Sequence, residues 1–319
     1  MGRSKLEAIV DVAFLFPGQG SQEPGMLHHL MPDQDTVGVV REMSGVLGFD
    51  VLSLDTAKAL KSTIGVQLSL LAAGVATARC LLNLGIRPSV VAGMSVGAFA
   101  AAVVADAISL SDAAKLVKSR AEQMERLHPS GYGMAAIIGL SETQISSIIE
   151  DVTTDAQPVF ISNLNAPRQI VVAGFVRAIE AVLARAHALG AHKTEWLRVS
   201  VFSHCPLMES VAHSLDQQLQ NMEVRDPKCV YISNMRARVV RSANGVQEDL
   251  ANNIAHTVRW HEATVVAQQL GSQMYIEMHP GHVLSDLVRD NLVGVEAHPV
   301  SSTNLKWLVA HAQGVEHFR

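Results

Sequence analysis

Short apolar runs of strand length alternate along this chain with longer segments of helical period. The first run covers residues 12–16 and the second covers 89–92. Between them, residues 63–84 are apolar on nearly every face, which predicts a helix buried on all sides. Runs at 230–232 and 274–277 continue the alternation. The pattern predicts an α/β fold in which a large domain contains a parallel sheet.

The order of the predicted strands and helices changes in residues 133–198. Strand, helix, strand, strand, helix and strand segments follow one another there, an order typical of a ferredoxin-like domain. The segments are 134–139, 141–151, 158–161, 169–173, 176–189 and 193–197. Since the larger pattern lies on both sides, we predict that this small domain is inserted into a large domain made of residues 1–132 and 199–319.

Further helices are predicted in the large domain from their apolar spacing. They cover residues 35–47, 98–105, 111–127, 207–222, 250–255 and 260–270. The helix from 111 begins with a hydroxyl side chain followed by an acidic one, so Ser111 is its expected N-cap and Asp112 lies in its first turn.

The segment Gly93-Met94-Ser95-Val96-Gly97 lies between the strand at 89–92 and the helix at 98–105. A serine between glycines at such a junction is typical of a nucleophile elbow, in which a tight turn exposes the hydroxyl above the sheet. The N–H groups at the start of the helix would face an anion formed there. The alternative is that the glycines only permit close packing.

Composition narrows the class of protein. The 25 basic and 30 acidic residues give a net charge of −5, which argues against a nucleic-acid partner. The three cysteines have no metal spacing and indicate a reducing compartment, so we expect a cytoplasmic protein. The first apolar run is too short for a signal peptide. The uncharged stretch 89–105 reads as strand, turn and helix, so no membrane contact is expected.

A serine nucleophile needs a base, and composition does not choose one among 14 histidines. His204 ends an apolar segment just before a predicted helix, which is where sites collect above a sheet. The alternative is a hydrogen-bonded core histidine. His279 and His282 could share a metal ion, but they have no nearby carboxylate or cysteine pattern, so no metal site is predicted.

Four motifs occur in order: Phe16-Pro17-Gly18-Gln19-Gly20-Ser21-Gln22, Gly93-x-Ser95-x-Gly97, Leu116-Val117-x-x-Arg120 and Val199-Ser200-Val201-x-Ser203-His204-Cys205. Together they resemble the malonyl-CoA:acyl-carrier-protein acyltransferase family. The resemblance runs from residue 12 to about residue 290, across the predicted insert. It implies an enzyme that forms an acyl-serine and works by ping-pong kinetics.

The resemblance also implies roles for individual residues. Ser95 would be the nucleophile, His204 the general base and later acid, and Asn253 would orient His204 through its main-chain carbonyl. The N–H groups of Gln19 and Val96 would form the oxyanion hole. Arg120 would hold the malonyl carboxylate, since a planar guanidinium binds a carboxylate through two hydrogen bonds.

Substrates and partners follow from the same resemblance. Malonyl-CoA would donate the acyl group, and an acyl carrier protein with a phosphopantetheine or CoA-like arm would accept it. No cofactor is expected beyond the CoA thioester itself. Possible further substrate contacts are Met94, Gln67 and Asn163.

Softer signals resemble one branch, the malonyl transfer (epsilon) subunit of bacterial malonate decarboxylase. These signals are Gly25-Met26-Leu27-His28, Gly131-Tyr132-Gly133-Met134, and Leu250-Ala251-x-Asn253 followed by Val258-x-Trp260-His261. The chain also departs from the family pattern: Met94 stands where housekeeping members usually carry histidine, and residues 276–284 replace a Gly-Pro-Gly-Lys pattern. The main expectation is therefore priming of a malonate decarboxylase carrier, with other decarboxylase subunits as possible partners. The alternatives are the housekeeping transacylase of fatty-acid synthesis, a serine esterase, and a non-catalytic assembly subunit.

Overall fold

A computed structural model describes residues 11–127, 130–197, 199 and 201–314. Its larger sheet has six strands in the order β10-β9-β1-β2-β7-β8. These are β1 (Val12–Phe16), β2 (Val90–Gly93), β7 (Val230–Ile232), β8 (Val239–Val240), β9 (Met274–Glu277) and β10 (Glu296–Pro299). All neighbours pair in parallel except β7 and β8. The fold is thus mixed α/β with a mainly parallel sheet, as predicted.

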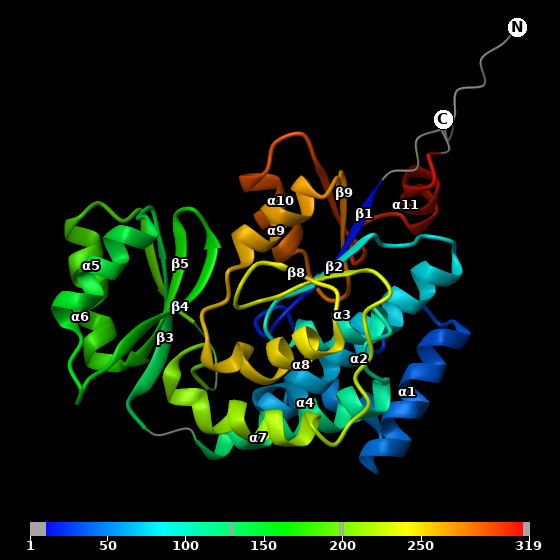
Figure 1. Ribbon diagram of the computed structural model, residues 1–319, viewed down its shortest axis with the longest axis horizontal. Helices are drawn as coiled ribbons and strands as arrows, with labels where there is room; N and C mark the ends of the chain where they lie inside the picture. Colours follow the sequence, from blue (N-terminus) through cyan, green and yellow to red (C-terminus); the bar gives the residue numbers. More distant parts are fainter. Residues whose placement is uncertain (1–10, 128–129, 198, 200, 315–319) are drawn as a thin grey trace, which may run out of the picture.

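Alternate residues of the central strand face two separate cores. Phe14 and Phe16 of β1 face a core formed with helices on one side, whereas Ala13 and Leu15 face a second core on the other. The first side carries α1 (Gln34–Leu47), α2 (Thr63–Asn83), α3 (Gly97–Val104), α4 (Leu110–Arg126), α7 (Glu209–Leu219), α8 (Ala243–Asn252) and part of α11 (Leu305–Ala312). The second carries α9 (Trp260–Gln269) and α10 (Val283–Asn291). The sheet is therefore enclosed between helices (Figure 1).

The helix α2 is the described helix that is long and apolar enough to cross a membrane. It is 21 residues long, and 89% of its most apolar window is buried inside the protein. It lies against α1, α3 and α4. Its apolar faces are therefore explained by the core, as the sequence predicted.

A second, four-stranded sheet stands beside the first (Figure 1, green). Its strands are β3 (Tyr132–Ile138), β4 (Val159–Ala166), β5 (Gln169–Phe175) and β6 (Lys193–Trp196), in the order β4-β5-β3-β6. All its pairs are antiparallel. The helices α5 (Glu142–Val152) and α6 (Val176–Ala188) share its own apolar core. The strand begins at Tyr132, one residue before the predicted start of the insert.

Hydrogen bonds join β4 of the small sheet to Thr257 and Val258 of the large part. The N–H of Val258 donates to the carbonyl of Ser162 on β4 at 2.9 Å, and the N–H of Leu164 donates back to Val258 at 2.8 Å. The hydroxyl of Thr257 adds a bond to the carbonyl of Ile161 at 2.8 Å. The small sheet is therefore fixed to the large part at β4.

Several element boundaries differ from the prediction. Ser109, not Ser111, is the N-cap of α4, because its hydroxyl accepts the N–H of Asp112 at 3.0 Å. The hydroxyl of Ser111 instead donates to Glu42. The predicted helix 207–222 begins as a 3-10 turn at Pro206, since proline favours a first-turn position. The helix predicted at 250–255 starts earlier, at Ala243, because Ser242 caps it.

Candidate active site

The turn between β2 and α3 presents Ser95 in a left-handed conformation, with φ at 56°. Only glycine fits at the positions two residues before and two residues after it. A Cβ added to Gly93 would lie 2.1 Å from the carbonyl carbon of Gly97, and one added to Gly97 would lie 2.2 Å from the carbonyl oxygen of Phe16. This strained turn is the geometry of a nucleophile elbow.

The imidazole of His204 lies within hydrogen-bond distance of the serine. Its Nδ1 is 2.7 Å from the carbonyl oxygen of Asn253, and its Nε2 is 2.7 Å from Ser95 Oγ. Because a carbonyl only accepts, Nδ1 carries the proton and Nε2 is left to accept from the hydroxyl. The N–H of His204 also donates to the carbonyl of Ile254 at 2.7 Å. The base is therefore held by its ring and by its backbone.

Arg120 reaches the same hydroxyl from α4. Its Nη2 donates to Ser95 Oγ at 3.1 Å, and its Nη1 donates to Gln67 Oε1 at 2.7 Å. The side chain is 1% exposed, and its Nε has no hydrogen-bond partner. No carboxylate among the described residues forms an ion pair with it. The site therefore holds a buried cation that lacks an anion, which is an unfavourable arrangement until an anion binds.

Burial shifts both titratable groups of the site toward their neutral forms. It lowers the pKa of Arg120 to about 9. It lowers the pKa of His204 to about 3, and the nearby charge of Arg120 adds to that shift. At neutral pH the imidazole is therefore uncharged and able to accept the serine proton.

Asn234 supports the turn, and the sequence analysis missed it. Its Oδ1 accepts the N–H of Ser95 at 2.8 Å, and its Nδ2 donates to the carbonyl of Gly93 at 2.7 Å. It lies two residues after the end of β7, and polar residues just beyond a buried parallel strand were the available signal. Since the N–H of Ser95 is occupied, it is not free to stabilise an oxyanion.

The proposed oxyanion donors lie beside the turn. Val96 follows Ser95 and is 1% exposed. Gln19 is half-buried, and the preceding Gly18 packs so closely on the turn that a Cβ would lie 2.7 Å from the carbonyl oxygen of Met94. Among the described residues, neither Gln19 nor Val96 donates its N–H to a protein acceptor. Both groups are therefore available to a ligand.

The other predicted contacts lie at varying distances from this centre. Gln67 touches Arg120 and so belongs to the site. Met94 packs against the apolar core that α9 and α10 share. Asn163 lies in the bridge between β4 and Val258, where its Oδ1 accepts the hydroxyl of Ser162. The structure shows no hydrogen bond from the described Asn163 to Ser95, His204 or Arg120, so its role stays a prediction.

A pocket of about 400 Å³ opens beside His204, between the small sheet with α5 and two segments of the large part, residues 204–206 and 255–257. The large part contributes Pro206 and Ala255 to its wall, and the small sheet and α5 contribute Ile149 and Phe160. The described lining combines apolar side chains with polar ones, Glu150 and His204 among them. Of the residues that meet at Ser95, His204 is the one that lines this pocket.

Comparisons with known proteins agree with this geometry. A family model for the acyl transferase domain matches residues 13–305. The malonyl CoA-acyl carrier protein transacylase of Escherichia coli K12 is 34% identical over 283 residues, which cover 87% of this chain and 91% of that protein. The Haemophilus influenzae protein of the same name is 33% identical over 302 residues, 92% of this chain and 96% of its own length.

Solved structures show the same relationship. The transacylase of Coxiella burnetii superposes with a TM-score of 0.90 at 33% identity, covering 96% of this chain and 98% of that one. A malonyl-transacylase described in complex with a type II PKS acyl-carrier protein gives a TM-score of 0.88 at 33% identity, over 95% and 99% of the two chains. The match covers nearly the whole chain, and Ser95 Oγ lies within hydrogen-bond distance of His204 Nε2. This chain is therefore an enzyme of the acyl transferase family.

Proposed function

We propose that this enzyme moves a malonyl group from malonyl-CoA to the arm thiol of an acyl carrier protein through a malonyl-serine. The observation that carries the proposal is the buried, anion-free guanidinium of Arg120, 3.1 Å from Ser95 Oγ. A group that needs an anion, placed beside the nucleophile, fits an acyl chain that ends in a carboxylate. The names of the relatives, malonyl CoA-acyl carrier protein transacylases, support the same substrate class.

In the first half-reaction Ser95 Oγ attacks the thioester carbonyl while its proton passes to His204 Nε2. The N–H groups of Gln19 and Val96 stabilise the oxyanion. The C–S bond then breaks, and His204 returns the proton to the CoA sulfur. In the second half-reaction the carrier thiol gives its proton to His204 and attacks the acyl-serine, which releases the hydroxyl with its proton restored.

The partner of His204 suits a reversible transfer. A neutral carbonyl, that of Asn253, orients the ring without adding a negative charge. The imidazolium formed in each half-reaction is therefore not strongly stabilised, and its proton is readily returned. The thioester is already an activated acyl donor, so we propose no cofactor beyond it. We also place the enzyme in the cytoplasm, since CoA thioesters and reduced cysteines both belong there.

Among malonyl transferases, the housekeeping reaction is favoured over decarboxylase priming. The relatives reported above carry the transacylase name. The decarboxylase interpretation depends on the softer motifs at residues 25–28, 131–134, 250–253 and 258–261, so it stays a second candidate. The two differ in the acceptor: an ordinary phosphopantetheine carrier in one, a carrier with a CoA-like arm in the other.

We also interpret residues 133–198 as a ferredoxin-like insert in a hydrolase-like large domain. The strand–helix–strand–strand–helix–strand order and the strand order β4-β5-β3-β6 support this interpretation. The insert then forms one wall of the pocket at His204.

The proposal is tested by incubating the enzyme with labelled malonyl-CoA and analysing the peptide that contains Ser95 by mass spectrometry. We expect one malonyl group on Ser95, none in Ser95→Ala, and its loss when carrier is added. An unmodified serine under conditions that release CoA contradicts the proposal. Rapid hydrolysis of simple esters without an acceptor would favour an esterase instead. Comparing the two carriers as acceptors then separates the housekeeping role from the decarboxylase role.

A further inference from the structure

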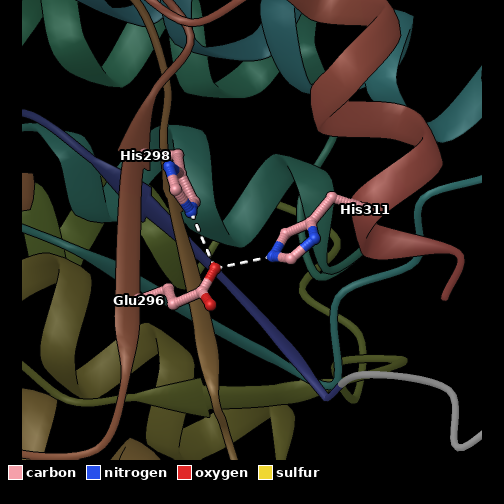
Figure 2. Close-up of side chains that lie close together, drawn as sticks. All are labelled: Glu296, His298 and His311. Carbon is pink, nitrogen blue, oxygen red and sulfur yellow. Dashed lines mark hydrogen bonds and ion pairs between the residues drawn. The ribbon is translucent and has the colours of Figure 1, made fainter. Parts of the chain in front are cut away.

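The edge strand β10 and the C-terminal helix α11 bring three metal-binding side chains together (Figure 2). Glu296 and His298 lie two residues apart on β10, so their side chains project from the same face of the strand. His311 comes from the last turn of α11. Glu296 Oε2 lies 3.1 Å from His298 Nε2 and 2.6 Å from His311 Nε2. The cluster lies at the β10 edge of the sheet, whereas Ser95 follows the interior strand β2.

The spacing of the three atoms is close to that of a metal's ligands. All three lie within 4.8 Å of one another. Bonds of about 2.0–2.2 Å in a tetrahedral zinc site place neighbouring ligand atoms about 3.3 Å apart. The three atoms are therefore already near the spacing that the ligands of one ion need. The side chains are 55%, 22% and 38% exposed in the order Glu296, His298, His311, so an ion and its waters can reach them.

A tryptophan fixes the direction of both imidazoles. The ring of Trp307 stacks on His311 with centroids 4.6 Å apart and an interplanar angle of 16°. The rings of Trp307 and His298 pack in a T-shaped arrangement, with centroids 5.0 Å apart and an interplanar angle of 70°. Rings held this way lose less conformational freedom when they bind an ion, which favours binding.

We propose that Glu296, His298 and His311 bind one divalent transition-metal ion, such as Zn²⁺, with water completing its coordination. Two imidazoles and one carboxylate are a set that zinc, nickel and copper accept, whereas magnesium and calcium prefer oxygen alone. On binding, each Nε2 directs its lone pair at the ion, with the ring proton on Nδ1 or released to solvent. The ion replaces the hydrogen bonds now made to Glu296 and joins α11 to the sheet edge.

This inference does not depend on the proposed acyl transfer. It also differs from the sequence prediction, which expected no metal and weighed only His279 and His282. His282 pairs with Asp286 at 2.6 Å as a single histidine and carboxylate. That pair offers two ligands where the β10–α11 cluster offers three, so it is a matched control within the same chain.

The test is a titration of the full-length protein with Zn²⁺ at neutral pH, by calorimetry against a chelator of known affinity. We expect one equivalent per chain in the wild type. His311→Ala and Glu296→Gln should each weaken Zn²⁺ binding at least about tenfold. Loss of a residue that only supports a metal ligand already lowers affinity by about that factor, and loss of a ligand itself should cost no less. His282→Ala should bind as the wild type does. The proposal is overturned if no ion binds, or if binding is unchanged in His311→Ala and Glu296→Gln.

A second measurement reports the location of the ion. Co²⁺ bound at the cluster should quench the fluorescence of Trp307, and Trp307→Phe should abolish that quenching while Co²⁺ still binds. Added Zn²⁺ should also raise the melting temperature of the wild type but not of His311→Ala. Quenching that persists in Trp307→Phe would place the ion elsewhere and contradict the proposal.

Discussion

We propose that the guanidinium of Arg120 serves recognition of the substrate rather than stability of the fold. It is buried, it has an unpartnered Nε, and it pairs with no carboxylate in the described chain. Removing such a group leaves no charged partner behind in the free enzyme. Loss of Arg120 should therefore lower activity mainly toward acyl groups that carry a negative charge.

Arg120→Ala is expected to lower kcat/KM for malonyl transfer by about 100-fold or more, because a buried charge-assisted contact is lost. Transfer of an acetyl group, which has no distal carboxylate, should fall by less than about tenfold over the same comparison. The two rates are measured with malonyl-CoA and acetyl-CoA in parallel. Arg126→Ala removes an exposed arginine from the last turn of the same helix and should change neither rate. Equal losses for both substrates would contradict the assignment of Arg120.

Some site residues could be predicted from the sequence, and others could not. Ser95 is recognisable because the elbow needs glycines at fixed positions around it. His204 is one of 14 histidines: its place at the end of an apolar segment made it a candidate, and the motif resemblance then gave it a role. Asn234 was missed because it acts through the main chain of Gly93 and Ser95, and such contacts leave no spacing rule in a sequence.

At the scale of the helices and strands, glycines in two helices illustrate opposite demands. Gly38 lies within α1, and a Cβ there would meet nothing within 4 Å. Gly65 lies in the first turn of α2, where a Cβ would be 2.3 Å from the carbonyl oxygen of Ala59. The same substitution should thus have opposite effects at the two positions.

Gly38→Ala is expected to raise the free energy of unfolding by about 0.5–1 kcal/mol, because alanine restricts the unfolded chain and favours the helix. Gly65→Ala should lower it by about 1–3 kcal/mol, since backbone atoms must move to relieve the clash. Urea unfolding of the two variants and the wild type measures both changes. A destabilised Gly38→Ala, or a Gly65→Ala as stable as the wild type, would contradict the packing described.

The two strands of the larger sheet that the sequence analysis missed, β8 and β10, have a weak apolar pattern. The strand β10 reads Glu296-Ala297-His298-Pro299, and at this sheet edge Ala297 and Pro299 are buried, whereas Glu296 is exposed and His298 half-buried. The short β8 pairs with β7 alone. By contrast β1 is buried at every residue, and its apolar run was readily recognised. Edge strands need less apolar surface, so sequence patterns reveal them less well.

For the whole molecule, we propose that substrate reaches His204 through the pocket between the small sheet and residues 204–206 and 255–257, so that access depends on both parts of the chain. Ser146 on α5 lines this pocket, whereas its neighbour Ser147 lines a separate one near α6. Ser146→Trp should fill part of the route to His204 and raise KM for malonyl-CoA and for the carrier by about tenfold. Ser147→Trp adds the same bulk outside the route and should leave both values unchanged. Steady-state kinetics of the two variants decide the matter, and equal effects would contradict this path.

The stretch from Asn253 to Val258 serves two structures at once. Its first carbonyls hold the ring and the backbone of His204, and its last residues pair with β4 of the small sheet. A movement of the small sheet relative to the large part would therefore displace the same peptide units that orient the imidazole of His204. The width of the pocket beside β4 and the alignment of His204 Nε2 with Ser95 Oγ are thus expected to change together.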